Sequence, residues 1–386
     1  MELKFDPIPL CQELVRIPSL SGQEGDVMAL VISSMQLFGF DEAWQDPSGN
    51  TIGVLRGTGK GGSHRLLVDI HTDTVPVTSP QSWQHDPFGG ELADGRIYGR
   101  GAVDIKAGLA CALAGLASRP REDFSGEIWV AATVLEEMIE GAATGLVLDS
   151  AAERGGLPDY CIVIEPTLLK IGTAQKGRAG IRMQTTGVAA HTSRAELGVN
   201  AVYRMLPAIQ GVRDMPKRSD ELLGLEIFEL VEILSSPLPG NSIVPDGCRA
   251  RFDCRLLLGE TADSLLDRFR RAVPVDVDVD LWPVSVEMYT GGQLEKGDFH
   301  PAWSTSSDEP LPKAALRALE AAGLPVETYK VPYCCNASAV TQGGVPVIVF
   351  GPGDIAQAHA VDEWVEASQL PLAASVLGEL AMNLLD

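Results

Sequence analysis

Short, mostly apolar runs recur along this chain, and a polar or acidic residue or a glycine follows each of them within two residues. They cover residues 65–70, 128–134, 160–164 and 346–350. A run of this length between polar residues predicts a buried strand. Residues 105–116 are rich in Ala and Leu and predict a helix among these strands. Strands and helices that alternate in this way indicate a domain of the α/β class.

The pattern changes after about Lys176. From residue 248 to 256, apolar side chains alternate with Arg and Asp, which is typical of a half-buried strand. Further strands and helices are predicted at 182–186, 201–209, 261–273 and 275–281. Their order suits a small α+β domain with an open-faced sheet. We therefore expect residues 177–287 to form a domain inserted into a larger one, which consists of residues 1–176 and 288–386.

Two short motifs predict local structure. Ser21-Gly22-Gln23-Glu24 has the spacing of a capping box, in which the first and fourth residues bond each other's backbone, so it predicts the start of a helix. Asp94-Gly95 lies between two short strand-like segments and predicts a tight hairpin turn.

Length, charge and cysteine usage narrow the class of protein. A chain of 386 residues exceeds the ~250–300 residues that one hydrophobic core usually supports, so two domains are expected. The 30 Lys and Arg against 52 Asp and Glu give a net charge of −22, which disfavours nucleic acid and anionic membranes as partners. Seven scattered Cys without a Cys-x-x-Cys pair indicate buried thiols in a reducing compartment. Because we find no signal peptide and no apolar stretch of ~20 residues, we expect a cytoplasmic protein.

Side chains that bind metals follow the predicted strands or lie in adjacent loops. They are His71, Asp104, Glu137, Glu165 and His359. In an open α/β sheet, binding sites lie beyond the carboxyl ends of the strands. Carboxylates and imidazoles together suit zinc, and also cobalt or manganese. Five such groups are more than one catalytic zinc needs, whereas two ions that share one carboxylate would use all five.

Two other carboxylate positions have predicted supporting roles. Asp73 lies two residues after His71 in extended chain, where it can hold the second ring nitrogen of that imidazole. If the chain is also extended at Glu136-Glu137, the two side chains point to opposite sides, so one can bind metal while the other takes a proton. The alternative for this pair is a solvated acidic pair at the start of a helix.

Five motifs occur in order along the chain. They are His71-Thr72-Asp73-Thr74-Val75-Pro76, Gly99-Arg100-Gly101-Ala102-Val103-Asp104-Ile105-Lys106, Glu136-Glu137, Ile164-Glu165-Pro166 and Ala358-His359-Ala360-Val361-Asp362-Glu363. As a set they resemble the zinc-dependent amidohydrolase and metallopeptidase family that includes acetylornithine deacetylase, succinyl-diaminopimelate desuccinylase, aminoacylase and the glutamate carboxypeptidases. The resemblance covers nearly the full length. One departure is Ala107, where the family often has Gly.

The resemblance implies a role for each of these residues. The five metal-binding side chains would hold two zinc ions, with Asp104 as the bridge. Of the glutamate pair, Glu136 would be the general base and Glu137 a ligand, while Asp73 would support His71. The implied fold is a mixed-sheet, zinc-peptidase-like catalytic domain, and the insert would be a ferredoxin-like lid and dimerisation domain.

The insert carries further motifs of the family. The segment Gly187-Val188-Ala189-Ala190-His191-Thr192-Ser193 is similar to a lid motif whose His reaches the active site of a partner subunit. Asn241 and Arg255 resemble positions that contact substrate, and the alternatives are a turn Asn and a solvated strand Arg. Gly351 and Gly353 can offer backbone N–H groups to a substrate carboxylate, or they form a plain turn.

The expected function is hydrolysis of the amide bond of an N-acyl amino acid, as in acetylornithine deacetylase. Water activated by two metal ions would attack the carbonyl, with Glu136 as base and His191 at the oxyanion. Arg255 would clamp the substrate's carboxylate. The expected partners are a small N-acyl amino acid or short peptide and a second copy of the chain. A carboxypeptidase or dipeptidase is the nearest alternative, and a catalytically inactive binding or sensor protein is an alternative of another class.

Overall fold

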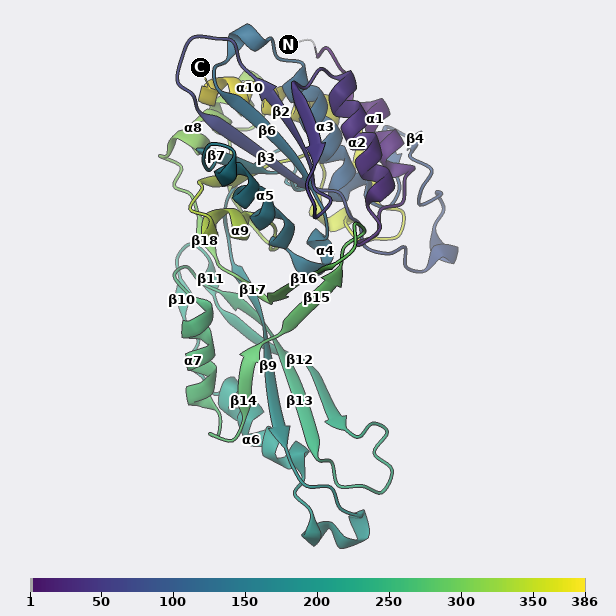
Figure 1. Cartoon of the computed structure of the whole chain (residues 1–386), viewed down its shortest axis with the longest axis vertical. Coiled ribbons are helices and arrows are strands. Elements are labelled where there is room, and N and C mark those ends of the chain that lie inside the picture. The colour runs from purple at the N-terminus through teal and green to yellow at the C-terminus, as the bar shows by residue number, and fades with distance from the viewer. Residues whose placement is uncertain (1–2, 386) are drawn as a thin grey trace. The chain divides into compact units, whose positions relative to one another are not determined.

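The computed structural model describes residues 3–385. The predicted absence of a signal peptide falls in part on Met1 and Glu2, which lie outside the described residues. The chain divides into two compact units, each with its own sheet (Figure 1). Unit 1 takes the chain up to Ala174, then Ser285–Leu294 and the residues from Ser304 onward. Unit 2 takes Gln175–Val284 and Glu295–Trp303.

Unit 1 contains a nine-stranded sheet. Its strands are β1 (Glu42–Gln45), β2 (Thr51–Arg56), β3 (Arg65–His71), β6 (Glu127–Thr133), β7 (Tyr160–Val163), β8 (Ile171–Gln175), β18 (Trp303–Ser304), β19 (Thr328–Val331) and β20 (Val347–Val349). Their order is β1-β2-β6-β3-β7-β20-β8-β18, and β19 pairs with β8. The central strands β6, β3, β7 and β20 are parallel, whereas β1, β2 and β8 add antiparallel. The predicted α/β class is therefore confirmed, and the sheet is mixed.

Helices cover both faces of this sheet. They are α1 (Pro7–Val15), α2 (Gly25–Leu37), α3 (Ala107–Ala117), α4 (Glu136–Ile139), α5 (Ala142–Glu153), α8 (Pro310–Ala321), α9 (Ala337–Gln342) and α10 (Gln369–Leu385). In Figure 1, α5 lies in front of the strands and α10 behind them. All residues of α3 are buried because α1, α10 and the sheet surround it, which explains its Ala- and Leu-rich sequence.

A small antiparallel sheet of unit 1 contains the predicted hairpin. It is formed by β4 (Glu91–Ala93), β5 (Arg96–Tyr98) and β21 (Trp364–Glu366). Asp94 and Gly95 join β4 to β5 with φ of 49° and 79°. Both values are positive, as the tightest hairpin turns require, so the prediction of this turn is confirmed.

Unit 2 has the order β9, α6, β12, β13, α7, β14, which is that of a ferredoxin-like fold. Their bounds are β9 (Gly177–Thr186), α6 (Ala201–Arg213), β12 (Ile227–Ser236), β13 (Gly247–Leu256), α7 (Ala262–Ala272) and β14 (Asp278–Leu281). The antiparallel sheet runs β12-β13-β9-β14. Shorter strands of this unit are β10 (Ser219–Asp220), β11 (Gly224–Leu225) and β17 (Phe299–His300). The strands β15 (Pro283–Glu287) and β16 (Gln293–Gly297) pair with each other, and the residues of each are divided between units 1 and 2.

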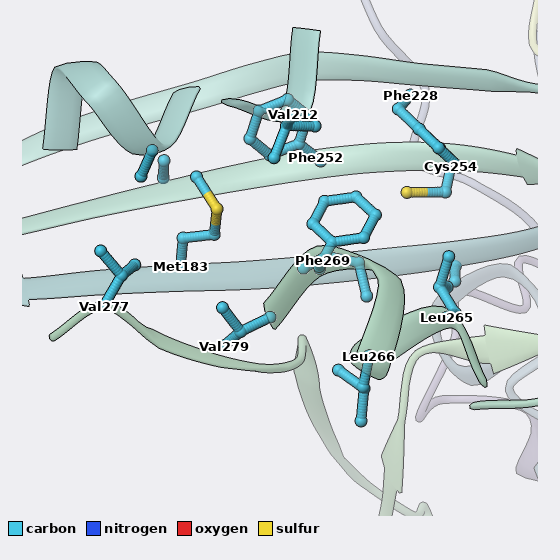
Figure 2. Packing of buried hydrophobic residues seen from close by; sticks show 14 of the residues in the cluster. Met183, Val212, Phe228, Phe252, Cys254, Leu265, Leu266, Phe269, Val277 and Val279 are labelled. Atoms are coloured by element: carbon cyan, nitrogen blue, oxygen red, sulfur yellow. The ribbon is translucent and has the colours of Figure 1, made fainter. Parts of the chain in front are cut away.

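The core of unit 2 lies between its sheet and helices α6 and α7. Along β13 the apolar residues are buried and the intervening Arg and Asp are not, as the alternating sequence predicts. Phe269 of α7 packs edge-on against Phe228 and Phe252, with ring centroids 5.3 and 5.8 Å apart (Figure 2). The helix begins after Thr261, whose side chain accepts the N–H of Ser264.

The predicted capping box at the start of α2 is wrong. The helix begins at Gly25, so Glu24 is its N-cap residue and makes no side-chain cap.

Short turns of 3₁₀-helix occur at Pro80–Ser82, Arg121–Asp123, Thr192–Leu197 and Ile355–Gln357, and an irregular π turn at Ala102–Lys106. Among the helices described between residues 3 and 385, none is both long enough and apolar enough to cross a membrane.

Candidate metal centre

The predicted metal-binding side chains of unit 1 come from one edge of its sheet. Strands β6, β3 and β7 are parallel neighbours, so their carboxyl ends meet. His71 ends β3, Glu165 follows β7, and Glu137 lies in α4, just after β6. Asp104 lies in the irregular turn before α3, and His359 follows a 3₁₀ turn near the C-terminus.

The five side chains form two groups that share one carboxylate. His71, Asp104 and Glu165 have ligand atoms within 4.8 Å of one another, and so do Asp104, Glu137 and His359. The first group is buried, whereas the side chain of His359 is 51% exposed. The second group therefore has access to solvent.

The two oxygens of Asp104 face different groups. Its Oδ1 lies 3.1 Å from Nε2 of His71, and its Oδ2 lies 3.3 Å from Nε2 of His359. Nε2 of His359 is also 3.0 Å from a Glu137 carboxylate oxygen, and Nε2 of His71 is 3.8 Å from one of Glu165. A carboxylate in this position fits the bridge between two divalent ions.

The ring orientation of His71 also fits a metal ligand. Its Nδ1 lies 3.1 Å from the backbone carbonyl of Asp73, which can only accept, so Nδ1–H donates to it. Nε2 faces Asp104, and once it has lost its proton it is the nitrogen that can bind a metal. The predicted support comes chiefly from the main chain of Asp73, because its carboxylate is 3.6 Å from Nδ1.

The carboxylate of Asp73 holds the start of α4 instead. Its two oxygens accept the N–H groups of Glu136 and Glu137 at 2.9 and 3.1 Å. The chain there is helical, so the condition of an extended chain is not met, and the two glutamates differ in direction by about 100° rather than 180°. Only Glu137 contacts His359, so the two glutamates still have different surroundings.

Charge and burial in this centre call for a cation. Burial raises the pKa of Glu136 and of Glu165 well above the usual value, and nearby carboxylates raise both further. For Asp104, burial opposes ionisation, but hydrogen bonds from His359 and His71 outweigh it and lower the pKa below its usual range. A set of buried carboxylates and imidazoles of this composition suits divalent zinc, cobalt or manganese.

An ion pair behind the centre joins the two chain segments that carry Asp104 and His359. Glu363 and Arg100 are 0% and 1% exposed and are in contact. Oε1 of Glu363 accepts the N–H groups of Val103 and Asp104 at 3.0 and 3.2 Å, and Arg100 donates to the carbonyl of His359 at 3.4 Å. We did not predict this role, although both residues lie in the quoted motifs.

Unit 2 carries the predicted oxyanion donor, His191, and two predicted substrate contacts, Asn241 and Arg255. His191 is exposed, and its Nδ1 accepts the N–H of Ser193 at 3.1 Å. Asn241 is exposed in a loop. Arg255 is 37% exposed on β13 and lies 3.4 Å from the carboxylate of Asp253.

The structure contradicts the role predicted for the two glycines of the Gly351-Pro352-Gly353 turn. The N–H of Gly351 donates to the hydroxyl of Thr167 at 3.0 Å, and that of Gly353 donates to the side chain of Gln369 at 2.7 Å. Because both N–H groups are already bonded within unit 1, they are not free to bind a substrate carboxylate. The alternative, a plain turn, describes them.

The chain is similar to known proteins over nearly its full length. A model of peptidase family M20/M25/M40 matches residues 67–383. The chain is 30% identical over 394 residues to the uncharacterised protein YgeY of Escherichia coli K12, covering 99% of this chain and 95% of the relative. It is 28% identical over 388 residues to succinyl-diaminopimelate desuccinylase of Acidiphilium cryptum, covering 97% of each. The fold is similar to that of aminopeptidase PepT from Bacillus cereus, with a TM-score of 0.75 and 20% identity over 98% of each chain.

Proposed function

Because the chain belongs to peptidase family M20/M25/M40 and is therefore a hydrolase of amide bonds, we propose that it cleaves N-acyl amino acids with two metal ions. The observation that carries this proposal is the pair of ligand groups that share Asp104. His71 and Glu165 would hold one ion, and Glu137 and His359 the other. The relative named as a desuccinylase supports an acylated amino acid as the substrate.

The chain's own residues would divide the chemistry between them. When bound, the two ions would polarise the amide carbonyl and acidify the water between them. Glu136 is half-buried beside this place, at the start of α4 and next to the ligand Glu137, and a carboxylate there can take a proton and give it back. It would take the proton of the attacking water and return it to the leaving nitrogen.

Unit 2 would serve as a lid and dimerisation domain. Since Nδ1 of His191 accepts the N–H of Ser193, a neutral ring carries its proton on Nε2. An exposed Nε2–H is the donor that a developing oxyanion needs. We propose that the chain forms a homodimer and that His191 donates to the oxyanion in the partner's site, while Arg255 and Asn241 bind the substrate.

The experiment is a substrate panel with native protein loaded with zinc, cobalt or manganese. Release of free amine from N-acetyl and N-succinyl amino acids is expected, and elemental analysis should find two ions per chain. Turnover of dipeptides alone would favour the carboxypeptidase or dipeptidase alternative. Metal-loaded protein that cleaves neither class would favour the inactive sensor.

Glu136→Gln tests the general base. We expect kcat to fall by at least ~10²–10⁴-fold, the usual contribution of a positioned base, while both ions are retained. The matched control is Glu127→Gln, which removes a carboxylate at the opposite end of β6 and should leave kcat unchanged. If Glu136→Gln loses metal and Glu137→Gln retains it, the assigned roles are reversed.

Mixed dimers test the role of His191. One chain carries Glu136→Ala and the other His191→Ala, and each homodimer should be nearly inactive. If His191 acts on the partner's site, one of the two sites in the mixed dimer is complete, and about half of the activity per dimer returns. Mixed dimers as inactive as their parents would place His191 within its own chain's site.

A further inference from the structure

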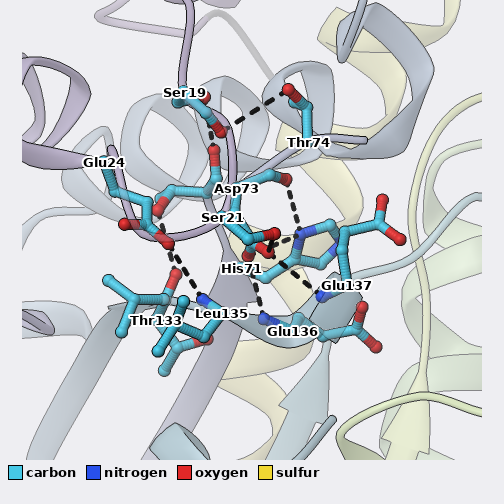
Figure 3. Close-up of polar contacts among 12 residues, drawn as sticks. Ser19, Ser21, Glu24, His71, Asp73, Thr74, Thr133, Leu135, Glu136 and Glu137 are labelled. Carbon is cyan, nitrogen blue, oxygen red and sulfur yellow. Dashed lines mark hydrogen bonds and ion pairs between the residues drawn. The ribbon is translucent and has the colours of Figure 1, made fainter. Parts of the chain in front are cut away.

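The segment Ser21–Glu24, where we predicted a capping box, lies against the start of α4 in unit 1. Glu24 is 0% exposed, and its Oε1 accepts the N–H of Leu135 at 3.1 Å and that of Gly22 at 3.0 Å (Figure 3). Glu24 and Leu135 are 111 residues apart in sequence. The carboxylate therefore joins the N-terminal segment to the bend between β6 and α4.

This bend has an unusual backbone conformation. Leu135 is buried and has a φ of 63°, in the left-handed region that residues with a side chain rarely adopt. It immediately precedes Glu136, so its conformation sets the direction in which Glu136 leaves the sheet. A residue in such a conformation persists only when its surroundings hold it there.

A second carboxylate holds the next two residues. Asp73 accepts the N–H groups of Glu136 and Glu137, and the hydroxyl of Ser21 donates to Asp73 at 2.6 Å. The three successive N–H groups of residues 135–137 thus all donate to two carboxylates, and Ser21–Glu24 supplies one of these and contacts the other (Figure 3).

We infer that Glu24 is a positioning residue for the hydrolysis: by accepting the N–H of Leu135, it fixes the bend that aims Glu136 at the attacking water. This inference rests on the proposed role of Glu136 as general base. Glu24 itself touches neither substrate nor metal in this scheme. A misplacement of the base by ~1 Å can cost ~10²-fold in rate, so loss of the hydrogen bond should be visible in kcat.

The test compares three variants of the metal-loaded protein. Glu24→Ala removes the acceptor and should lower kcat by ~10–100-fold, with little change in KM and two ions retained. Glu24→Gln keeps an oxygen that can accept the same N–H groups, so kcat should stay within ~3-fold of the native value. Val31→Ala shortens a buried side chain of the adjacent helix α2 and should lower thermal stability without a comparable loss of kcat.

Hydrogen exchange provides a readout that does not depend on activity. In Glu24→Ala, amide exchange of a peptide covering residues 134–139 should speed up, whereas in Glu24→Gln it should match the native protein. Native exchange and native kcat in Glu24→Ala would overturn the inference, and so would a kcat of Glu24→Gln as low as that of Glu24→Ala. A loss of kcat in Val31→Ala equal to that of Glu24→Ala would also overturn it, because destabilisation alone would then explain the effect.

The two proposals can fail separately. If Glu136→Gln retains full activity, the assignment of the base is wrong, while exchange at residues 134–139 still reports whether Glu24 holds the bend. If exchange is unchanged in Glu24→Ala but Glu136→Gln is inactive, the base stands and the positioning role of Glu24 is refuted.

Discussion

Replacing Glu363 with Gln tests the buried ion pair that joins the segments carrying Asp104 and His359. One oxygen of Glu363 accepts two backbone N–H groups, and the other contacts Arg100. A Gln amide can accept hydrogen bonds on only one of these two sides. If its oxygen accepts the backbone N–H groups, its NH₂ faces the guanidinium of Arg100. If the amide is flipped, its oxygen faces Arg100 and its NH₂ faces the backbone N–H groups. Either orientation leaves buried donors without an acceptor.

The expected magnitude follows from burial. Glu363 and Arg100 are 0% and 1% exposed, and removing one partner of such a buried pair usually costs ~3–5 kcal/mol because the other charge stays uncompensated. The control is Glu366→Gln on the adjacent strand β21. Glu366 pairs with Arg96 at 3.0 Å, but these side chains are 35% and 39% exposed, so its loss should cost at most ~1 kcal/mol.

Urea unfolding of the metal-free variants measures this difference in the free energy of unfolding. Metal-free protein is used because bound ions would add their own binding energy to the folded state. Elemental analysis of the reloaded Glu363→Gln should also show less metal, since the backbone of two ligands is no longer held. If Glu363→Gln costs no more than Glu366→Gln, the ion pair does not have the stabilising role that its burial indicates.

Four further predictions concern the metal centre and the core of unit 2. Hydrogen bonds to Asp104 and Glu137 raise the pKa of His359 to about 10, so this ring must lose a proton to bind metal. Metal affinity should therefore rise with pH, about tenfold per pH unit for each proton released. Calorimetric titration with metal in buffers of different ionisation enthalpy measures the number of protons released. In the metal-free protein, protonated His359 stabilises the fold. This stabilisation is complete below pH 6.5, the usual pKa of His, and is lost as the pH rises through about 10. His71→Ala and His359→Ala should each lower the metal content found by elemental analysis, and full retention of both ions in either variant would contradict the ligand assignment. Phe269→Ala should cost ~3–5 kcal/mol in urea unfolding of unit 2 and leave the metal content unchanged, whereas a cost below ~1 kcal/mol would show that this ring is not central to the core.

Local patterns in the sequence determined the elements and the places of the predicted ligands. The strand predicted at 65–70 lies within β3 and lacks only its last residue, and the alternation at 248–256 matches the buried and open faces of β13. His71 lies at the end of its strand, as the sequence indicates. These features are predictable because the period of apolar residues records which side of an element is buried.

Tertiary packing decided which groups meet. The Ser21–Glu24 spacing matched a capping box, yet Glu24 bonds Leu135, 111 residues away. Asp73 accepts the N–H groups of Glu136 and Glu137, which are 63 and 64 positions further along the chain, at the start of α4. No local period carries this information, because a hydrogen bond between distant segments depends on how the strands are ordered in the sheet and which loops that order brings together.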